Sequence, residues 1–266
     1  MSSFRTIEFS DPLFERDHLR FITVKTKNLR GRADVAVFVP QGIETLTGCP
    51  VTILLHGVYG SAWCWPLKTG VHITAMQMIR DGILPPMVIA MPSDGLWGDG
   101  SAYLPHHQLD FEKWIAEDIP ALLKQSVPGV SNASPFFIAG LSMGGFGALR
   151  IGVKYHHVFR AAAGHSSITS LSQMALFAEE SLDNYKQVDE EDEDVWKTIL
   201  RHRDHLPAIR FDCGDKDELI EYNRLLHQQL EQLHIPHIYE EHPGGHEWPY
   251  WQKHILDTLR FFARLI

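Results

Sequence analysis

Residues 136–152 read FFIAGLSMGGFGALRIG, an apolar run followed by a serine and a glycine-rich segment. Glycine weakens both strands and helices, so its accumulation where a strand seems to meet a helix needs a specific reason. Gly140, Ser142 and Gly144 fit the pattern G-x-S-x-G, which places a serine on a sharp strand-to-helix turn. The two glycines let strand and helix approach each other. The pattern therefore predicts Ser142 as a nucleophile, and its spacing matches neither of the common phosphate-binding glycine patterns.

The segments around this turn alternate between strand-like and helix-like patterns. Short apolar runs, typical of strands covered on both faces, occupy residues 51–57, 87–93, 136–140, 161–167 and 208–214, with a weaker one at 237–243. Apolar residues at helical spacing predict helices at 111–127, with Pro120 as a kink or break, and at 143–155, 219–233 and 251–266. This alternation predicts an α/β fold of three layers, a mostly parallel central sheet with helices on both faces.

Two segments depart from the alternation. Residues 21–26 and 33–40 alternate apolar and polar side chains around a turn-rich segment, which predicts an antiparallel hairpin. Residues 168–205 are interpreted as a helical insertion between two strands, and a role as a cap over the site stays open. The chain shows neither internal repeats nor a linker composition, so we expect residues 1–266 to form a single domain.

The amino-acid composition limits the kinds of partner and cofactor that we expect for this protein. The formal net charge of -9 disfavours nucleic acid or an anionic membrane as the main partner. No long apolar stretch occurs and the first residues carry charges, so a soluble, cytoplasmic protein is expected. Three cysteines without a C-x-x-C pair argue against a disulfide framework or a structural zinc site, and most histidines are scattered, so no metal is predicted. The oligomeric state, including a homo-oligomer, stays open.

A nucleophilic serine needs a base, and the base needs an acid that holds it. In this architecture the acid follows the serine along the chain and lies just past a later strand. Residues 208–219 read AIRFDCGDKDEL and offer three candidates, of which Asp217 is preferred over Asp215 and then Asp212. Asp212 falls within the predicted strand, and Asp215 is suited to capping the next helix.

The base is expected in a loop after the last strand. Residues 240–251 read EEHPGGHEWPYW, in which two glycines precede His246 and the final helix follows it. This order favours His246 as the base. His242 is the nearby rival, and His254 lies within the predicted final helix, where a structural role is expected.

A tetrahedral intermediate also needs two backbone N–H donors for its oxyanion. One is the N–H of Met143, which follows the nucleophile, and the other is expected in the loop after the strand at 51–57, where Val58 comes next. His56, at the end of that strand, is interpreted as shaping the loop.

Several aromatic residues fall in loops after predicted strands, at the expected rim of the site. They are interpreted as a surface on which a sugar or phenolic ring of the substrate stacks, with packing beneath the loops as the alternative: Trp63, Trp65, Trp97 and Tyr103. His165 ends another strand and is a candidate for lining the pocket, although it could equally cap the insertion.

The segments LLHGVYG, GLSMGGFGALR, CGDKDEL and PGGHEWPYW together resemble the esterase D family of serine hydrolases, part of the α/β-hydrolases. The resemblance runs along most of the chain. It implies an α/β-hydrolase fold, Ser142, Asp217 and His246 as the catalytic triad, and Val58 and Met143 as oxyanion donors. The cysteine-containing segment of S-formylglutathione hydrolases is not found, which leaves the tributyrin-esterase type as the most similar one.

The expected function is therefore a carboxylesterase that acts on a small-molecule ester of a short acyl chain, without a cofactor. Esters of acetylated carbohydrates or hydroxycinnamic acids, S-formylglutathione hydrolysis, and acyl transfer on the same triad remain alternatives. A non-catalytic binding protein is disfavoured because no member of the triad is missing.

Overall fold

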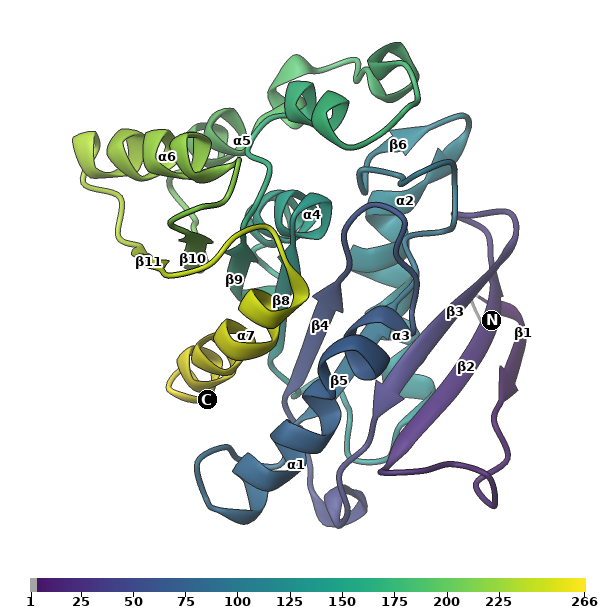
Figure 1. The fold of residues 1–266 in the computed structure, drawn as a ribbon. Coiled ribbons are helices and arrows are strands. Elements are labelled where there is room, and N and C mark those ends of the chain that lie inside the picture. Colours follow the sequence, from purple (N-terminus) through teal and green to yellow (C-terminus); the bar gives the residue numbers. More distant parts are fainter. Residues whose placement is uncertain (1–3) are drawn as a thin grey trace.

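A computed structural model describes residues 4–266 and contains a nine-stranded sheet of order β1-β2-β3-β5-β4-β8-β9-β10-β11 (Figure 1). The strands are β1 (Phe4–Phe9), β2 (Leu19–Thr26), β3 (Arg32–Phe38), β4 (Val51–Leu55), β5 (Val88–Pro92), β8 (Phe136–Leu141), β9 (Phe159–His165), β10 (Ala208–Gly214) and β11 (Ile238–His242). A separate small hairpin joins β6 (Pro105–His106) to β7 (Leu109–Asp110).

The pairing of the strands confirms the predicted fold class. β2 and β3 form the expected antiparallel hairpin, β1 adds to its outer edge, and β3 pairs antiparallel with β5. From β5 through β4, β8, β9 and β10 to β11, every pairing is parallel. The carboxyl ends of these parallel strands therefore meet at one edge of the sheet, where ligands collect in such folds.

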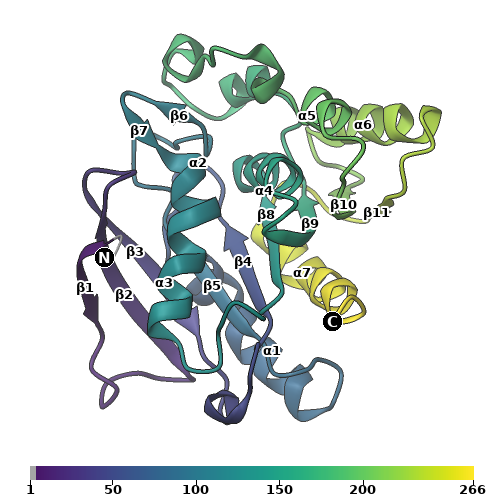
Figure 2. The ribbon, with the colours of Figure 1, turned by 180° about the vertical axis from the view of Figure 1, so that it is seen from behind.

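Helices cover both faces of the sheet. α1 (Val71–Arg80) and α7 (Trp248–Ala263) pack on one face, and α3 (Ile119–Ser126), α4 (Met143–Lys154) and α6 (Ile220–Gln232) contribute to the core on the other (Figures 1 and 2). Side chains alternate between the faces along each strand, so that Ile53 belongs to one apolar core and Leu54 to the other. Both cores are apolar, which explains the continuous apolar runs in the sequence.

The helices differ from the prediction at their ends. Residues 111–126 stay helical throughout, from α2 (Phe111–Lys113) through a π-helical turn (Trp114–Asp118) into α3. Pro120 therefore causes no break. It directly follows the π-helical turn, an irregularity of the kind that accompanies a missing N–H inside a helix. α7 begins at Trp248, earlier than expected, because Pro249 fits its first turn. No helix was expected at α1, and β1 was also missed.

The segment between β9 and β10 consists of short helices, as the insertion at 168–205 suggested. It holds the 3-10 turns Leu171–Leu176, Leu182–Tyr185 and Glu190–Glu193 and the helix α5 (Val195–Arg201). Figure 1 shows this green segment above the sheet, beside β6. Across residues 4–266, no helix has both the length and the apolar character that a membrane crossing requires.

Candidate active site

Ser142 lies on the turn between β8 and α4, and its backbone is strained. Its φ of 54° and ψ of -121° lie in a region that residues with side chains rarely occupy. A Cβ at Gly140 would lie 2.2 Å from the Gly144 carbonyl oxygen, and a Cβ at Gly144 would lie 2.5 Å from two carbonyl oxygens at the end of β4. Only glycine fits at both positions, so the structure supplies the reason for the two outer residues of G-x-S-x-G.

The structure brings Ser142, His246 and Asp217 together from three separate segments of the chain. The His246 Nε2 lies 3.0 Å from the Ser142 hydroxyl oxygen. The His246 Nδ1 lies 3.0 and 3.1 Å from the two Asp217 carboxylate oxygens. Since a carboxylate only accepts, Nδ1 of His246 carries a hydrogen, and Nε2 is left to accept from the serine hydroxyl.

The surroundings of Asp217 keep its carboxylate ionised. Burial raises the pKa of Asp217, but the hydrogen bond and the charge of His246, together with the Leu219 N–H that donates to Oδ1 at 2.9 Å, outweigh it and lower the pKa. Asp217 is itself only 3% exposed, so water does not compete for these contacts. An ionised, buried carboxylate holds the imidazole in one tautomer and one orientation.

The two rival aspartates have other partners. Asp212 is buried within β10 and accepts hydrogen bonds from His165 Nδ1 at 2.9 Å and from the Tyr250 hydroxyl at 2.9 Å, besides its ion pair with Arg210. Burial raises the pKa of Asp212, but the charges and hydrogen bonds of His165 and Arg210 outweigh it and lower the pKa. Asp215 is exposed, and its Oδ1 accepts from the Gly244 N–H at 3.1 Å. Asp215 therefore supports the loop that carries the histidine.

The rival histidines lie elsewhere too. His242 ends β11, and its ring stacks on that of His254 with centroids 4.0 Å apart. His254 also lies 3.3 Å from Asp257 on the same helix, α7. Both rings are therefore engaged away from Ser142.

The N–H groups of Val58 and Met143 are the two backbone donors that the sequence predicts for an oxyanion. Met143 is the first residue of α4, so its N–H has no partner within the helix. Within residues 4–266, neither N–H donates to a protein acceptor. His56 braces the Val58 loop: its Nδ1 lies 2.7 Å from the Gly57 carbonyl, and its Nε2 accepts from the Asp94 N–H at 3.0 Å. A ring bonded in this way shapes the loop, as predicted from its place in the sequence.

A cavity of about 380 Å³ opens in front of Ser142 and His246. The sequence-predicted Trp63 lines it and is 43% exposed. Its other walls include residues that sequence reasoning missed: Tyr59, Cys64, Lys68, Phe177, Trp248 and Trp251. Phe177 stacks on the His246 ring at 5.0 Å, and Trp251 meets that ring edge-on at 5.0 Å. The cavity is thus mainly apolar and aromatic, and Ser142 and His246 are part of its lining.

The placement of the remaining candidates at the rim is wrong. Trp65 and Tyr103 are buried, and they hold the backbone that leads to Val58: Trp65 Nε1 donates to the Leu55 carbonyl at 3.0 Å and the Tyr103 hydroxyl to the His56 carbonyl at 3.1 Å. Buried His165 is bonded to Asp212 and, through Nε2, lies 3.1 Å from the Thr258 hydroxyl. Trp97 is half-buried and packs against His106, His107 and Tyr185.

A proline at position 58 is the direct test of the first oxyanion donor, because proline lacks the N–H. We expect Val58→Pro to lower kcat/KM for an ester by about 10²- to 10³-fold, the usual loss for one such donor. Val58→Ala keeps the N–H and controls for the side chain. Rates for the two variants that differ by less than a factor of about three, at equal melting temperatures, would remove the Val58 N–H from the oxyanion site.

The sheet, the covering helices and the serine turn define an α/β-hydrolase fold. A family model named Esterase, described as "Putative esterase", matches residues 26–262. The chain therefore belongs to this esterase family.

Individual relatives agree with this assignment. An acetyl esterase from Caldicellulosiruptor saccharolyticus is 27% identical over 230 residues, which cover 80% of this chain and 82% of the relative. The structure of a ferulic acid esterase superposes with a TM-score of 0.80 at 22% identity and covers 98% of both chains. An S-formylglutathione hydrolase from Staphylococcus aureus superposes with a TM-score of 0.79 at 16% identity, over 97% of this chain and 99% of that one. These two structures are similar in fold.

Proposed function

We propose that this esterase is a serine carboxylesterase that hydrolyses short-chain acyl esters through an acyl-enzyme on Ser142. The observation that carries the proposal is the continuous hydrogen-bonded chain from the Ser142 hydroxyl through His246 to Asp217, next to two backbone N–H groups without a protein acceptor. The resemblance to the esterase D family and its tributyrin-esterase type supports the same reading of these residues.

In the proposed mechanism, the Ser142 oxygen attacks the ester carbonyl carbon while Nε2 of His246 takes the hydroxyl proton. Negative charge then develops on the carbonyl oxygen, which accepts from the N–H groups of Val58 and Met143. The carbon–oxygen bond to the alcohol breaks as His246 returns the proton to the leaving alkoxide, and the acyl group stays on Ser142. A water molecule then attacks this ester while His246 takes its proton, and the acid leaves as the bond from the acyl carbon to the Ser142 oxygen breaks and His246 returns the proton to that oxygen.

The cavity supports a small substrate with an apolar portion. A volume of about 380 Å³ lies at the low end of the range of small-molecule sites. Its aromatic walls favour an apolar acyl or aryl group. The acetyl esterase relative fits a short acyl chain, so we propose acetate esters as the first substrates to test.

The proposal is tested with purified protein and nitrophenyl esters from acetate to octanoate, together with tributyrin, an acetylated xylo-oligosaccharide and S-formylglutathione. We expect the highest kcat/KM for the shortest acyl chains. An alcohol added as a competing acceptor distinguishes hydrolysis from acyl transfer through the products formed. Inactivity of the wild type on every ester would refute the proposal.

Aromatic esters such as hydroxycinnamates are the second candidate substrates, and Trp63 is the observation that favours them. Its indole lines the cavity and is 43% exposed, so a ring of the substrate can stack on it. The ferulic acid esterase of similar fold fits this candidate. Trp248 adds a second aromatic wall to the cavity. The Lys68 ammonium lies 5.9 Å from the centroid of its ring.

We expect Trp63→Ala to raise KM for methyl ferulate by roughly 3- to 10-fold, since an aromatic pair contributes about 0.5–1.5 kcal/mol beyond its buried area. KM for a simple acetate should change much less. Trp97→Ala is the matched control, because it removes an indole that packs on His106 and Tyr185. Equal changes in KM for both esters would exclude stacking on Trp63.

A further inference from the structure

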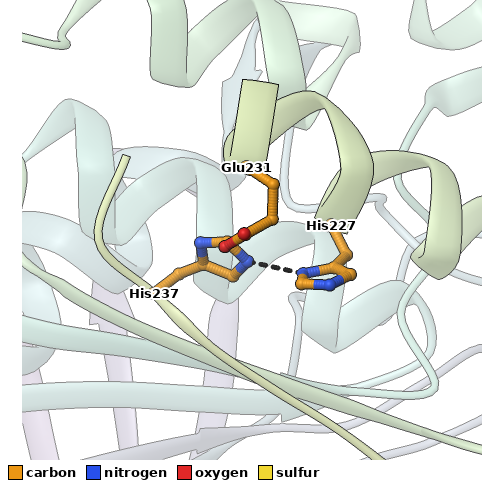
Figure 3. Close-up of side chains that lie close together, drawn as sticks. All are labelled: His227, Glu231 and His237. Carbon is orange, nitrogen blue, oxygen red and sulfur yellow. Dashed lines mark hydrogen bonds between the residues drawn. The ribbon is translucent and has the colours of Figure 1, made fainter. Parts of the chain in front are cut away.

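His227, Glu231 and His237 lie close together between α6 and the segment that leads into β11 (Figure 3). His227 and Glu231 lie one turn apart on the helix, and His237 comes from the segment that leads into β11. Each side chain offers one ligand atom, and these atoms lie within 4.8 Å of one another. The sequence did not predict this group, because His237 reaches the helix only through the turn that follows α6.

The hydrogen bonds of His237 show which of its ring nitrogens carries the hydrogen and which has a lone pair available for a metal. Its Nδ1 lies 2.8 Å from the Ile235 carbonyl oxygen, which only accepts, so Nδ1 carries the hydrogen and Nε2 presents a lone pair. Nε2 in turn lies 2.8 Å from Nδ1 of His227. A bond from one ring nitrogen to a backbone carbonyl is the usual way in which a protein orients a metal-binding histidine.

Aromatic neighbours hold both imidazoles in place. The His227 ring stacks on Tyr239 with centroids 4.7 Å apart, and the His237 ring stacks on Phe211 at 5.7 Å. Both histidines are half-buried, whereas Glu231 is exposed and free to adjust. Two fixed imidazoles and one adaptable carboxylate provide three ligands on one side of a site whose remaining side faces solvent.

We propose that His227 Nδ1, Glu231 and His237 Nε2 bind one Zn²⁺ ion, with water as the fourth ligand. Imidazole and carboxylate are ligands that zinc accepts in tetrahedral sites. Bond lengths of about 2.0–2.1 Å in that geometry place two ligand nitrogens about 3.3 Å apart, so the imidazoles need to separate only slightly from 2.8 Å. On binding, the hydrogen on Nδ1 of His227 moves to its Nε2, and the two rings turn so that both lone pairs point at an ion beside the former N–H···N bond.

The second histidine cluster of the described chain is less suitable. His242, His254 and Asp257 also bring three ligand atoms together, but the two imidazoles are stacked with an angle of 8° between their planes. The lone pair with which an imidazole nitrogen binds a metal lies in the plane of the ring. The lone pairs of two parallel, stacked imidazoles therefore do not point at one ion. In the His227 cluster the two planes meet at 64°, which allows convergence.

The ion would join two segments that lead to the active site. α6 begins at Ile220, just after Asp217, and β11 ends at His242, just before the His246 loop. The metal links these segments at the ends away from the triad. It therefore stabilises the folded state without contacting substrate, and the proposal does not depend on ester hydrolysis.

The experiment uses full-length protein treated with a chelator and freed of it, titrated with ZnCl₂ by calorimetry and followed by thermal melting. We expect one ion per chain and a rise in the melting temperature of about 5 °C or more at a Zn²⁺ concentration 100 times Kd. His237→Gln, His227→Gln and Glu231→Gln should each weaken binding by at least about tenfold.

His234→Asn is the matched control, because His234 lies on the same turn, is exposed and has a φ of 53° that asparagine tolerates. It should bind Zn²⁺ like the wild type. Unchanged affinity in both Glu231→Gln and His237→Gln, loss of binding in His242→Gln instead, or no calorimetric binding by the wild type would each overturn the proposal. Glu231 is exposed, so its variant tests the site even where a histidine variant fails to fold.

Discussion

Replacement of Ser142 with alanine is expected to lower kcat for nitrophenyl acetate by about 10⁵- to 10⁶-fold, the scale of loss when a triad serine is removed. The alanine retains the fold but leaves His246 with no hydroxyl to deprotonate, so an acyl-enzyme cannot form. Steady-state hydrolysis at saturating ester, with mass spectrometry of the protein to detect the acyl group, measures both consequences.

Two controls make this result specific to the nucleophile. Ser172→Ala removes an exposed hydroxyl in the segment between β9 and β10 and should leave turnover unchanged. The melting temperature of Ser142→Ala should stay within a few degrees of the wild type, because no core side chain is lost. Substantial turnover by a correctly folded Ser142→Ala variant would refute the serine mechanism.

Asp217→Asn is expected to lower kcat by about 10⁴-fold, as found when a triad aspartate becomes an amide. The asparagine NH₂ can donate to Nδ1 of His246, which favours the tautomer with its hydrogen on Nε2. That nitrogen then faces the Ser142 hydroxyl as a donor and cannot take its proton. Steady-state kinetics of the variant over a range of pH values measures the loss.

The matched control is Asp215→Asn, two residues away on the same loop. Asp215 accepts a hydrogen bond from the Gly244 N–H, and an asparagine oxygen can still accept it. We therefore expect a change in kcat of only a few-fold. The opposite order, with Asp215→Asn the more damaging substitution, would assign the acid role to Asp215 and contradict the role proposed for Asp217.

Much of the fold could be predicted from local patterns. Fully buried strands such as β8 and β10 carry nearly continuous apolar runs, because the sheet has an apolar core on each face. The G-x-S-x-G turn was visible because its glycines meet backbone atoms at distances that exclude any Cβ. Pro120 suggested a kink or a break, and the structure has no break there: a π-helical turn precedes it and the helix continues, which the local sequence pattern does not reveal.

The walls of the site were less predictable because loop position does not determine burial. Trp63 and Trp65 lie two residues apart, yet Trp63 is 43% exposed on the cavity and Trp65 is 1% exposed beneath it. Trp248 and Trp251 follow His246 closely in the sequence, and that proximity could have suggested them. Phe177 carried no such signal: it reaches the His246 ring from a segment of irregular short helices, through the three-dimensional path of the chain.

Tyr59, the residue after the proposed oxyanion donor Val58, links the wall of the cavity to the loop that carries Val58. The Tyr59 hydroxyl donates to the Phe177 carbonyl at 2.7 Å. Asp99 bonds to both segments: its backbone carbonyl accepts from the Tyr59 N–H, and its carboxylate accepts from the Glu179 N–H at 2.8 Å. For protein engineering, residues 177–180 therefore do not form a module that can be exchanged alone. A graft from another esterase that alters acyl preference would need to bring its counterparts of Tyr59 and Asp99 with it, since the new wall would otherwise change the transition-state contacts together with the specificity.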